Sequence, residues 1–251
     1  MATIDALYRY PVKGLSAEPL TAVTLAPGET FPFDRAFAIE NGPSGFDPAD
    51  PKHLSKRHYL MLMRNERLAA LATHFEPSTG ALTIRRDGAV VAEGTLHTAD
   101  GRAAIEKFFD GYSAGELRGP TRVLSSPGFS FSDAADKFVS LINLASLREL
   151  ETRVGRPVHP LRFRGNIYVE RMPAWGEFDW VGQRVTAGSA AFEVTARIDR
   201  CAATNVNPET AARDMTIPRT LLDAYGHPDC GIYLKVLGAG EIRVGDELAL
   251  A

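Results

Sequence analysis

Short apolar runs separated by glycine and proline limit what this chain can fold into more than any other feature of its sequence. In the first 40 residues these runs are 4–8, 22–25 and 36–39. In the last third, the segments 180–185 and 242–248 share a Val-Gly-x-x-apolar cadence. Short strands at this spacing are typical of a β-barrel and not of an alternating α/β sheet. We therefore expect a mostly β protein with a few short helices, of which the clearest are 101–112, 146–151 and 219–225.

The composition is that of an ordinary soluble protein and narrows the range of partners. The chain has 251 residues, 45% of them hydrophobic, and a formal net charge of -3. This charge gives no reason to expect nucleic acid or a membrane surface as a partner, and no apolar run approaches the roughly 20 residues needed to cross a bilayer. The N-terminus lacks the features of a signal peptide, and two cysteines are too few for a disulfide framework. We therefore expect free thiols in a reducing cytoplasm.

Cys201 is the candidate reactive group. It follows an alternating run, 192–198, that predicts a half-buried strand, and it precedes an Asn-Pro turn. Arg197 and Arg200 flank it, and nearby cations favour the thiolate, the form that attacks electrophiles or binds soft metals. A lone cysteine at a strand end is more often buried and inert, and that is our expectation for Cys230.

Several polar residues outside this segment stand in loops or at the starts of elements, where most of them have an ordinary structural explanation. Lys13 lies in a Tyr-Pro-Val-Lys-Gly loop, where a solvated lysine is common, and Asp34 could hold its neighbour Arg35 in place. Ser146, three residues before Glu149, fits a capping box at a helix start. Arg162, Arg164 and Asn166 lead into an apolar run that predicts a strand over 162–169.

Taken in order, these segments resemble one family. They are Tyr10-Pro11-Val12-Lys13-Gly14, Phe33-Asp34-Arg35, Arg162-Phe163-Arg164-Gly165-Asn166-Ile167, Trp180-Val181-Gly182, Arg200-Cys201 through Pro208-Glu209-Thr210, and Ile242-Arg243-Val244-Gly245-Asp246. The chain resembles a MOSC-domain protein with its N-terminal β-barrel partner domain, related to the C-terminal part of molybdenum cofactor sulfurase and to the amidoxime-reducing component. A loop-rich segment at 113–136 then suggests an N-terminal domain over 1–120 and a MOSC β-barrel domain over 121–251.

The resemblance implies a molybdopterin-bound molybdenum with Cys201 as its protein ligand and as the catalytic residue. Soft thiolate suits a metal already held by dithiolene sulfurs. The pterin phosphate requires fixed cations and donors, and by position the candidates are Lys13, Arg35, Ser146, Arg162, Arg164 and Asn166. Gly165 stands where many relatives have proline, and Asn207 stands where aspartate is usual.

The resemblance leaves three functions open. The first is an oxidoreductase that removes oxygen from a small N-hydroxylated or N-oxide substrate with electrons from a separate donor protein. The second is a sulfur carrier or transferase with a persulfide on Cys201, and the third is a cofactor carrier without turnover. Too few cysteines are present to hold an iron–sulfur cluster, and the pyridoxal-phosphate domain of the full sulfurase is absent, so neither group is expected on this chain.

Overall fold

The computed structural model describes all 251 residues and contains a closed barrel of seven strands. Its order is β1 (Ala2–Arg9), β10 (Ile167–Glu170), β9 (Val139–Asn143), β13 (Asp229–Gly238), β12 (Ala190–Asp199), β11 (Arg184–Ala187) and β15 (Glu247–Leu250), which pairs with β1 again. All neighbours run antiparallel except β9 and β10. The short strand β2 (Glu18–Leu20) extends the sheet from β1. The predicted mostly β fold with a barrel is confirmed.

Buried and exposed side chains alternate along the barrel strands, and the buried ones form the core. In β12 the side chains of Ala190, Phe192 and Val194 are buried while those between them are partly exposed, as expected where successive side chains point to opposite faces. These residues belong to an apolar cluster of 23 buried side chains drawn from every strand of the barrel. The barrel interior is therefore filled with side chains and is not a channel.

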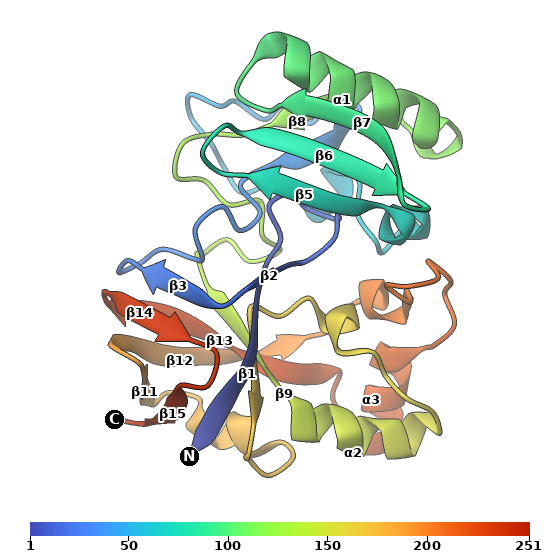
Figure 1. The fold of residues 1–251 in the computed structure, drawn as a ribbon. Coiled ribbons are helices and arrows are strands. Elements are labelled where there is room, and N and C mark those ends of the chain that lie inside the picture. Colours follow the sequence, from blue (N-terminus) through green and yellow to red (C-terminus); the bar gives the residue numbers. More distant parts are fainter.

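A smaller body lies above the barrel in Figure 1. Strands β5 (Ala72–Glu76), β6 (Ala81–Arg86) and β7 (Ala89–Thr95) form a meander, and the helix α1 (Ala99–Tyr112) covers it. A separate pair, β4 (Ala38–Asn41) and β8 (Thr121–Leu124), completes this body. Its own core contains Ile105 and Phe109 of α1, which lies over the predicted helix 101–112.

Strand pairings join the two halves of the sequence. Strand β1 of the N-terminal half lies in the barrel, and β3 (Ala22–Leu25) pairs with β14 (Gly240–Arg243). Strand β8, after residue 120, pairs with β4 of the smaller body. The division at 120/121 stays a prediction, and the pairings show how closely the two segments are interwoven.

Two helices lie against the barrel, α2 (Leu144–Val154) and α3 (Ile217–Tyr225). The cap of α2 is Asn143, whose side chain accepts the N–H of Ala145, so the predicted capping box at Ser146 is wrong because the helix begins earlier. The strand expected over 162–169 is also shorter, since Pro160–Phe163 form a 3₁₀ turn and β10 begins at Ile167. The longest helix has 14 residues, and none has the length and apolar character needed to span a bilayer.

Candidate functional site

A cavity of about 300 Å³ lies where loops of the barrel meet the segment 56–63. Its lining contains Cys201 and five of the six residues predicted to bind a cofactor: Lys13, Arg35, Arg162, Arg164 and Asn166. These residues come from loops after β1, before β4, around η4 (Pro160–Phe163) and after β12. The structure therefore brings together residues that are up to 188 positions apart in the sequence, from Lys13 to Cys201.

Cys201 stands two residues after the end of β12 in an extended conformation, and its thiol is free. The next four residues, Ala202–Asn205, form the 3₁₀ turn η6, and the Cys201 carbonyl accepts the N–H and the hydroxyl of Thr204 at 3.1 and 3.0 Å. These bonds fix the backbone on which the thiol is carried. Cys201 is partly exposed and lines the cavity.

Only one of the two arginines that flank Cys201 in sequence faces the cavity. Arg200 lines it, and its guanidinium donates to the carbonyls of Cys230 (2.7 Å) and Phe163 (3.0 Å). Arg197 instead lies over the ring of Phe178, 4.2 Å from its centroid. The expectation that both cations flank the thiol is wrong for Arg197, whose side chain packs on Phe178 and is not part of the cavity lining.

Arg162 supports the turn that follows Cys201. It donates to Asp214 Oδ1 at 2.7 Å and to the carbonyl of Asn205 at 3.0 Å. Its Nε is buried and has no hydrogen-bond partner, which is costly unless a ligand supplies an acceptor. Asn207 donates to Asp214 at 3.2 Å, a hydrogen bond that an aspartate in its place could not provide as a carboxylate.

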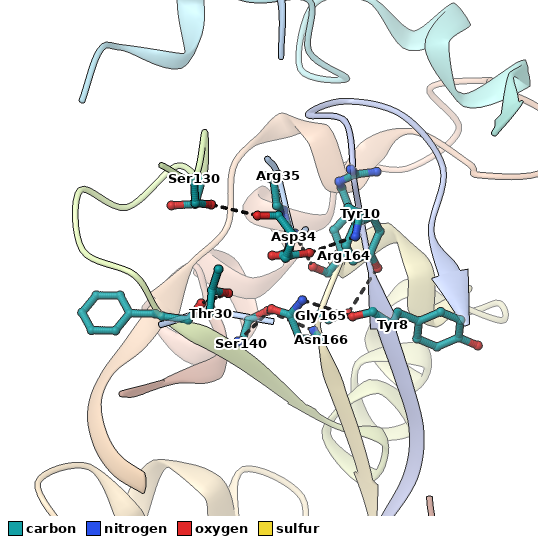
Figure 2. Close-up of polar contacts among 12 residues, drawn as sticks. Tyr8, Tyr10, Thr30, Asp34, Arg35, Ser130, Ser140, Arg164, Gly165 and Asn166 are labelled. Atoms are coloured by element: carbon teal, nitrogen blue, oxygen red, sulfur yellow. Dashed lines mark hydrogen bonds and ion pairs between the residues drawn. The ribbon is translucent and has the colours of Figure 1, made fainter. Parts of the chain in front are cut away.

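Arg35 and Arg164 lie over the same aromatic ring. The guanidinium carbons are 4.4 and 4.3 Å from the ring centroid of Tyr10, which is fully buried. Arg35 forms an ion pair with Asp34, as predicted from their adjacency, and its Nη2 donates to the carbonyl of Arg164 at 2.8 Å. Figure 2 shows these residues around the backbone of Tyr10, whose N–H donates to Asp34 Oδ1 at 2.8 Å.

Asp133 connects two lysines at the same cavity. Its carboxylate accepts from Lys13 at 2.5 Å and from Lys56 at 2.9 Å. Burial would raise the pKa of Asp133, yet the charges of Lys13 and Lys56 outweigh burial and hold that pKa well below its usual range. Burial lowers the pKa of Lys13, and Asp133 opposes this effect. Sequence reasoning missed both Lys56 and Asp133, because no local pattern connects two loop residues 77 positions apart.

Asn166 joins three segments at the base of this group. Its side-chain oxygen accepts the N–H and hydroxyl of Ser140 at 3.1 and 2.8 Å, and its Nδ2 donates to the Tyr8 carbonyl at 3.1 Å. The same residues appear in Figure 2. Asn166 therefore fastens the entry of β10 to β9 and β1, and so fixes Arg164 two residues before it.

Ser146 is not brought into this group. It lies in α2 and is completely buried on the side that faces η5 (Gly176–Trp180). Its hydroxyl lies 2.9 Å from Glu177 Oε1 and accepts the N–H of Trp175 at 2.8 Å. Burial raises the pKa of Glu177, with hydrogen bonds from Asn143 and Ser146 opposing it. Cys230 is likewise buried, and burial raises its pKa to about 12, which confirms the expectation that it behaves as a small core residue.

The cavity carries more cations than carboxylates. Its lining includes the cationic side chains of Lys13, Arg35, Lys56, Arg162, Arg164 and Arg200, and the carboxylates of Asp34, Asp133 and Asp199. Arg164 and Arg200 form no ion pair. Burial lowers the pKa of Arg164 to about 10, so its charge persists at neutral pH. The site is suited to an anion, and no group of three or more His, Cys, Asp or Glu could hold a metal ion by itself.

Comparisons with known proteins agree with this architecture. The model for the MOSC domain matches residues 120–249, and the model for the MOSC N-terminal beta barrel domain matches residues 1–141. Among curated proteins, mitochondrial amidoxime reducing component 2 of Rattus norvegicus is 31% identical over 120 residues, which is 43% of this chain and 35% of that protein. Mitochondrial amidoxime-reducing component 1 of Mus musculus is 29% identical over 133 residues, 48% of this chain and 38% of that protein.

The match thus spans little more than a third of the length of these relatives. Among solved structures, the YuaD protein from Bacillus subtilis is 15% identical with a TM-score of 0.46, over 98% of this chain and 93% of that one. A likeness at this TM-score supports no inference about function.

Proposed function

The chain belongs to the MOSC family, and we propose that its cavity binds a molybdenum cofactor with which the protein reduces N-hydroxylated or N-oxide substrates. The observation that carries this proposal is that Cys201 shares one cavity with an excess of fixed cations. The names of the curated relatives, amidoxime reducing components, supply the substrate class. The electrons would come from a separate donor protein.

The residues present fit such a cofactor in three respects. A phosphate would satisfy cations that have no carboxylate partner, notably Arg164 and Arg200. The buried Nε of Arg162 lacks an acceptor within the protein. A single soft thiolate is the expected donor for a metal whose other ligands arrive with the cofactor, and the cavity contains one thiol, that of Cys201.

Each residue then has a distinct part. Lys13, Arg35, Arg164 and Arg200 would supply the charge that holds the phosphate. Cys201 would bind molybdenum through its sulfur. Arg162 fixes the turn after Cys201 through the Asn205 carbonyl, and Asn166 fixes the backbone that carries Arg164. When bound, the cofactor supplies two-electron chemistry, in which an N–OH bond is broken with two electrons and two protons and water is released.

The test is to load the protein in a host that makes molybdopterin and to assay N-hydroxy reduction with an artificial electron donor. We expect reduction by the loaded protein and none by Cys201→Ala. Mass spectrometry of the same preparation would reveal any persulfide on Cys201, and a persulfide there would indicate sulfur transfer. Bound cofactor with neither reduction nor persulfide would indicate a cofactor carrier, and either outcome would overturn the reductase proposal.

A further inference from the structure

We propose that Tyr10 is a positioning residue whose ring couples Arg35 and Arg164 into a single dicationic unit for a phosphate group. The inference rests on the proposed function in one respect, that the anion is the phosphate of the cofactor. It adds a residue that binds no ligand itself and acts through the two arginines.

The first step is the cost of placing two like charges together. Both guanidiniums lie within 4.4 Å of the same ring centroid, and one carboxylate, Asp34, pairs with Arg35 while none pairs with Arg164. An aromatic face attracts a desolvated cation through its quadrupole. The Tyr10 ring therefore offsets part of the repulsion for both arginines at once.

The second step is that Tyr10 cannot easily move away. It is 1% exposed, and its hydroxyl donates to the Gly165 carbonyl at 3.2 Å. Burial raises the pKa of Tyr10, although Arg164 and Arg35 oppose this effect, so the ring stays neutral. Its main-chain carbonyl accepts the N–H of Arg35 at 2.7 Å, so the ring and the backbone of Tyr10 hold the same arginine from two sides.

The third step concerns the backbone of the arginines. Arg35 and Arg164 both have left-handed conformations, with φ of 52° and 53°, which is uncommon for residues other than glycine. Such conformations persist where the contacts of the surrounding structure hold them in place, and they are frequent at ligand-binding sites. Arg35 Nη2 donates to the Arg164 carbonyl at 2.8 Å, so the two strained residues are linked directly as well as through the ring.

The test compares Tyr10→Phe, which keeps the ring, with Tyr10→Leu, which removes it, in the cofactor-free chain. Arginine side-chain NMR reports the positioning without any ligand, because the order parameters of the Nε–H groups of Arg35 and Arg164 measure how firmly each side chain is held. We expect high order parameters for both groups in the native protein and in Tyr10→Phe, and lower values in Tyr10→Leu. Titration with inorganic phosphate should then give affinities within about twofold for Tyr10→Phe and about tenfold weaker for Tyr10→Leu, because arginine side chains that the ring no longer holds must be ordered on binding.

The outcomes separate the two proposals. Unchanged Nε–H order parameters or unchanged phosphate affinity in a folded Tyr10→Leu would overturn the positioning role, as would an equal loss in Tyr10→Phe. A native protein in which both arginines are rigid but which binds no phosphate would overturn the dicationic anion unit. Failure of cofactor loading alone would overturn the proposed function and leave the positioning role intact. If Tyr10→Leu does not fold, Tyr10→Met replaces it, since methionine adapts to irregular core space.

Discussion

Removing the charge of Asp214 should destabilise the protein far more than removing the charge of an exposed aspartate. Asp214 pairs with Arg162 at 2.7 Å, and the Arg162 side chain is 1% exposed whereas that of Asp214 is 24% exposed. In Asp214→Asn the guanidinium stays buried without its countercharge. Breaking a buried pair from one side costs about 3–5 kcal/mol. Since Asp214 is partly exposed, we expect a loss of about 2–3 kcal/mol in the free energy of unfolding.

The matched control is Asp223→Asn. Asp223 pairs with Arg219 at the same distance, 2.7 Å, but the two side chains are 53% and 73% exposed. Such pairs contribute roughly 0.3–0.5 kcal/mol. Urea unfolding at pH 7 measures both variants against the native protein. Similar small losses in Asp214→Asn and Asp223→Asn would refute the reasoning that burial of Arg162 sets the cost.

The pH dependence of this effect has a definite sign. Burial would raise the pKa of Asp214, but hydrogen bonds from Arg162 and Asn207 outweigh it and lower that pKa in the folded protein. A group whose folded pKa is depressed stabilises the fold above its unfolded pKa, near 3.9 for aspartate. The stability advantage of the native protein over Asp214→Asn should therefore be complete at pH 7 and shrink as the pH falls below about 4. An advantage that grows on acidification would contradict this account.

Three further predictions follow from particular contacts. Ser146→Ala removes a donor from the buried Glu177 carboxyl and an acceptor from the Trp175 N–H. Urea unfolding should therefore show a loss of about 1–3 kcal/mol in the free energy of unfolding, while the affinity for phosphate stays unchanged. A weakened phosphate affinity would instead place Ser146 at the site. Gly165→Ala would place a Cβ 2.5 Å from Ile142 Cγ1. We expect a lower thermal midpoint than for Gly115→Ala, where a Cβ has no atom within 4 Å; equal midpoints would contradict the steric argument. Iodoacetamide should label Cys201 in the folded chain and leave the buried Cys230 unmodified until urea is added. Peptide mass spectrometry identifies the labelled cysteine, and labelling of Cys230 in the native state would contradict its placement in the core.

Strand content was predictable because it depends on local alternation. The runs at 4–8 and 22–25 lie within β1 and β3, and the helix expected at 219–225 lies within α3. Boundaries near polar residues were less predictable. Residues 160–163 form a 3₁₀ turn that ends at Arg164, and the strand begins only at Ile167, since Arg164 takes a left-handed conformation fixed by tertiary contacts.

Only those residues of the candidate site that belong to short sequence motifs were predictable. Motif position indicated Lys13, Arg35 and Cys201, and the fold brings them to one cavity. Asp133 and Lys56 carried no such signal, because their pairing depends on two loops that meet only in the folded chain. Ser146 illustrates the converse error, since a polar residue at a plausible position is used to satisfy the buried Glu177.

Molybdenum and pterin content per chain tests the central claim most directly. The protein would be produced in a host that makes molybdopterin, beside Cys201→Ala and the matched thiol control Cys230→Ala, and each would be checked for folding. The account predicts nearly one molybdenum and one pterin per chain in the native protein and in Cys230→Ala, with molybdenum sharply reduced in Cys201→Ala. Absence of both from the native protein, or equal molybdenum in all three, would contradict the assignment of Cys201 and its cavity.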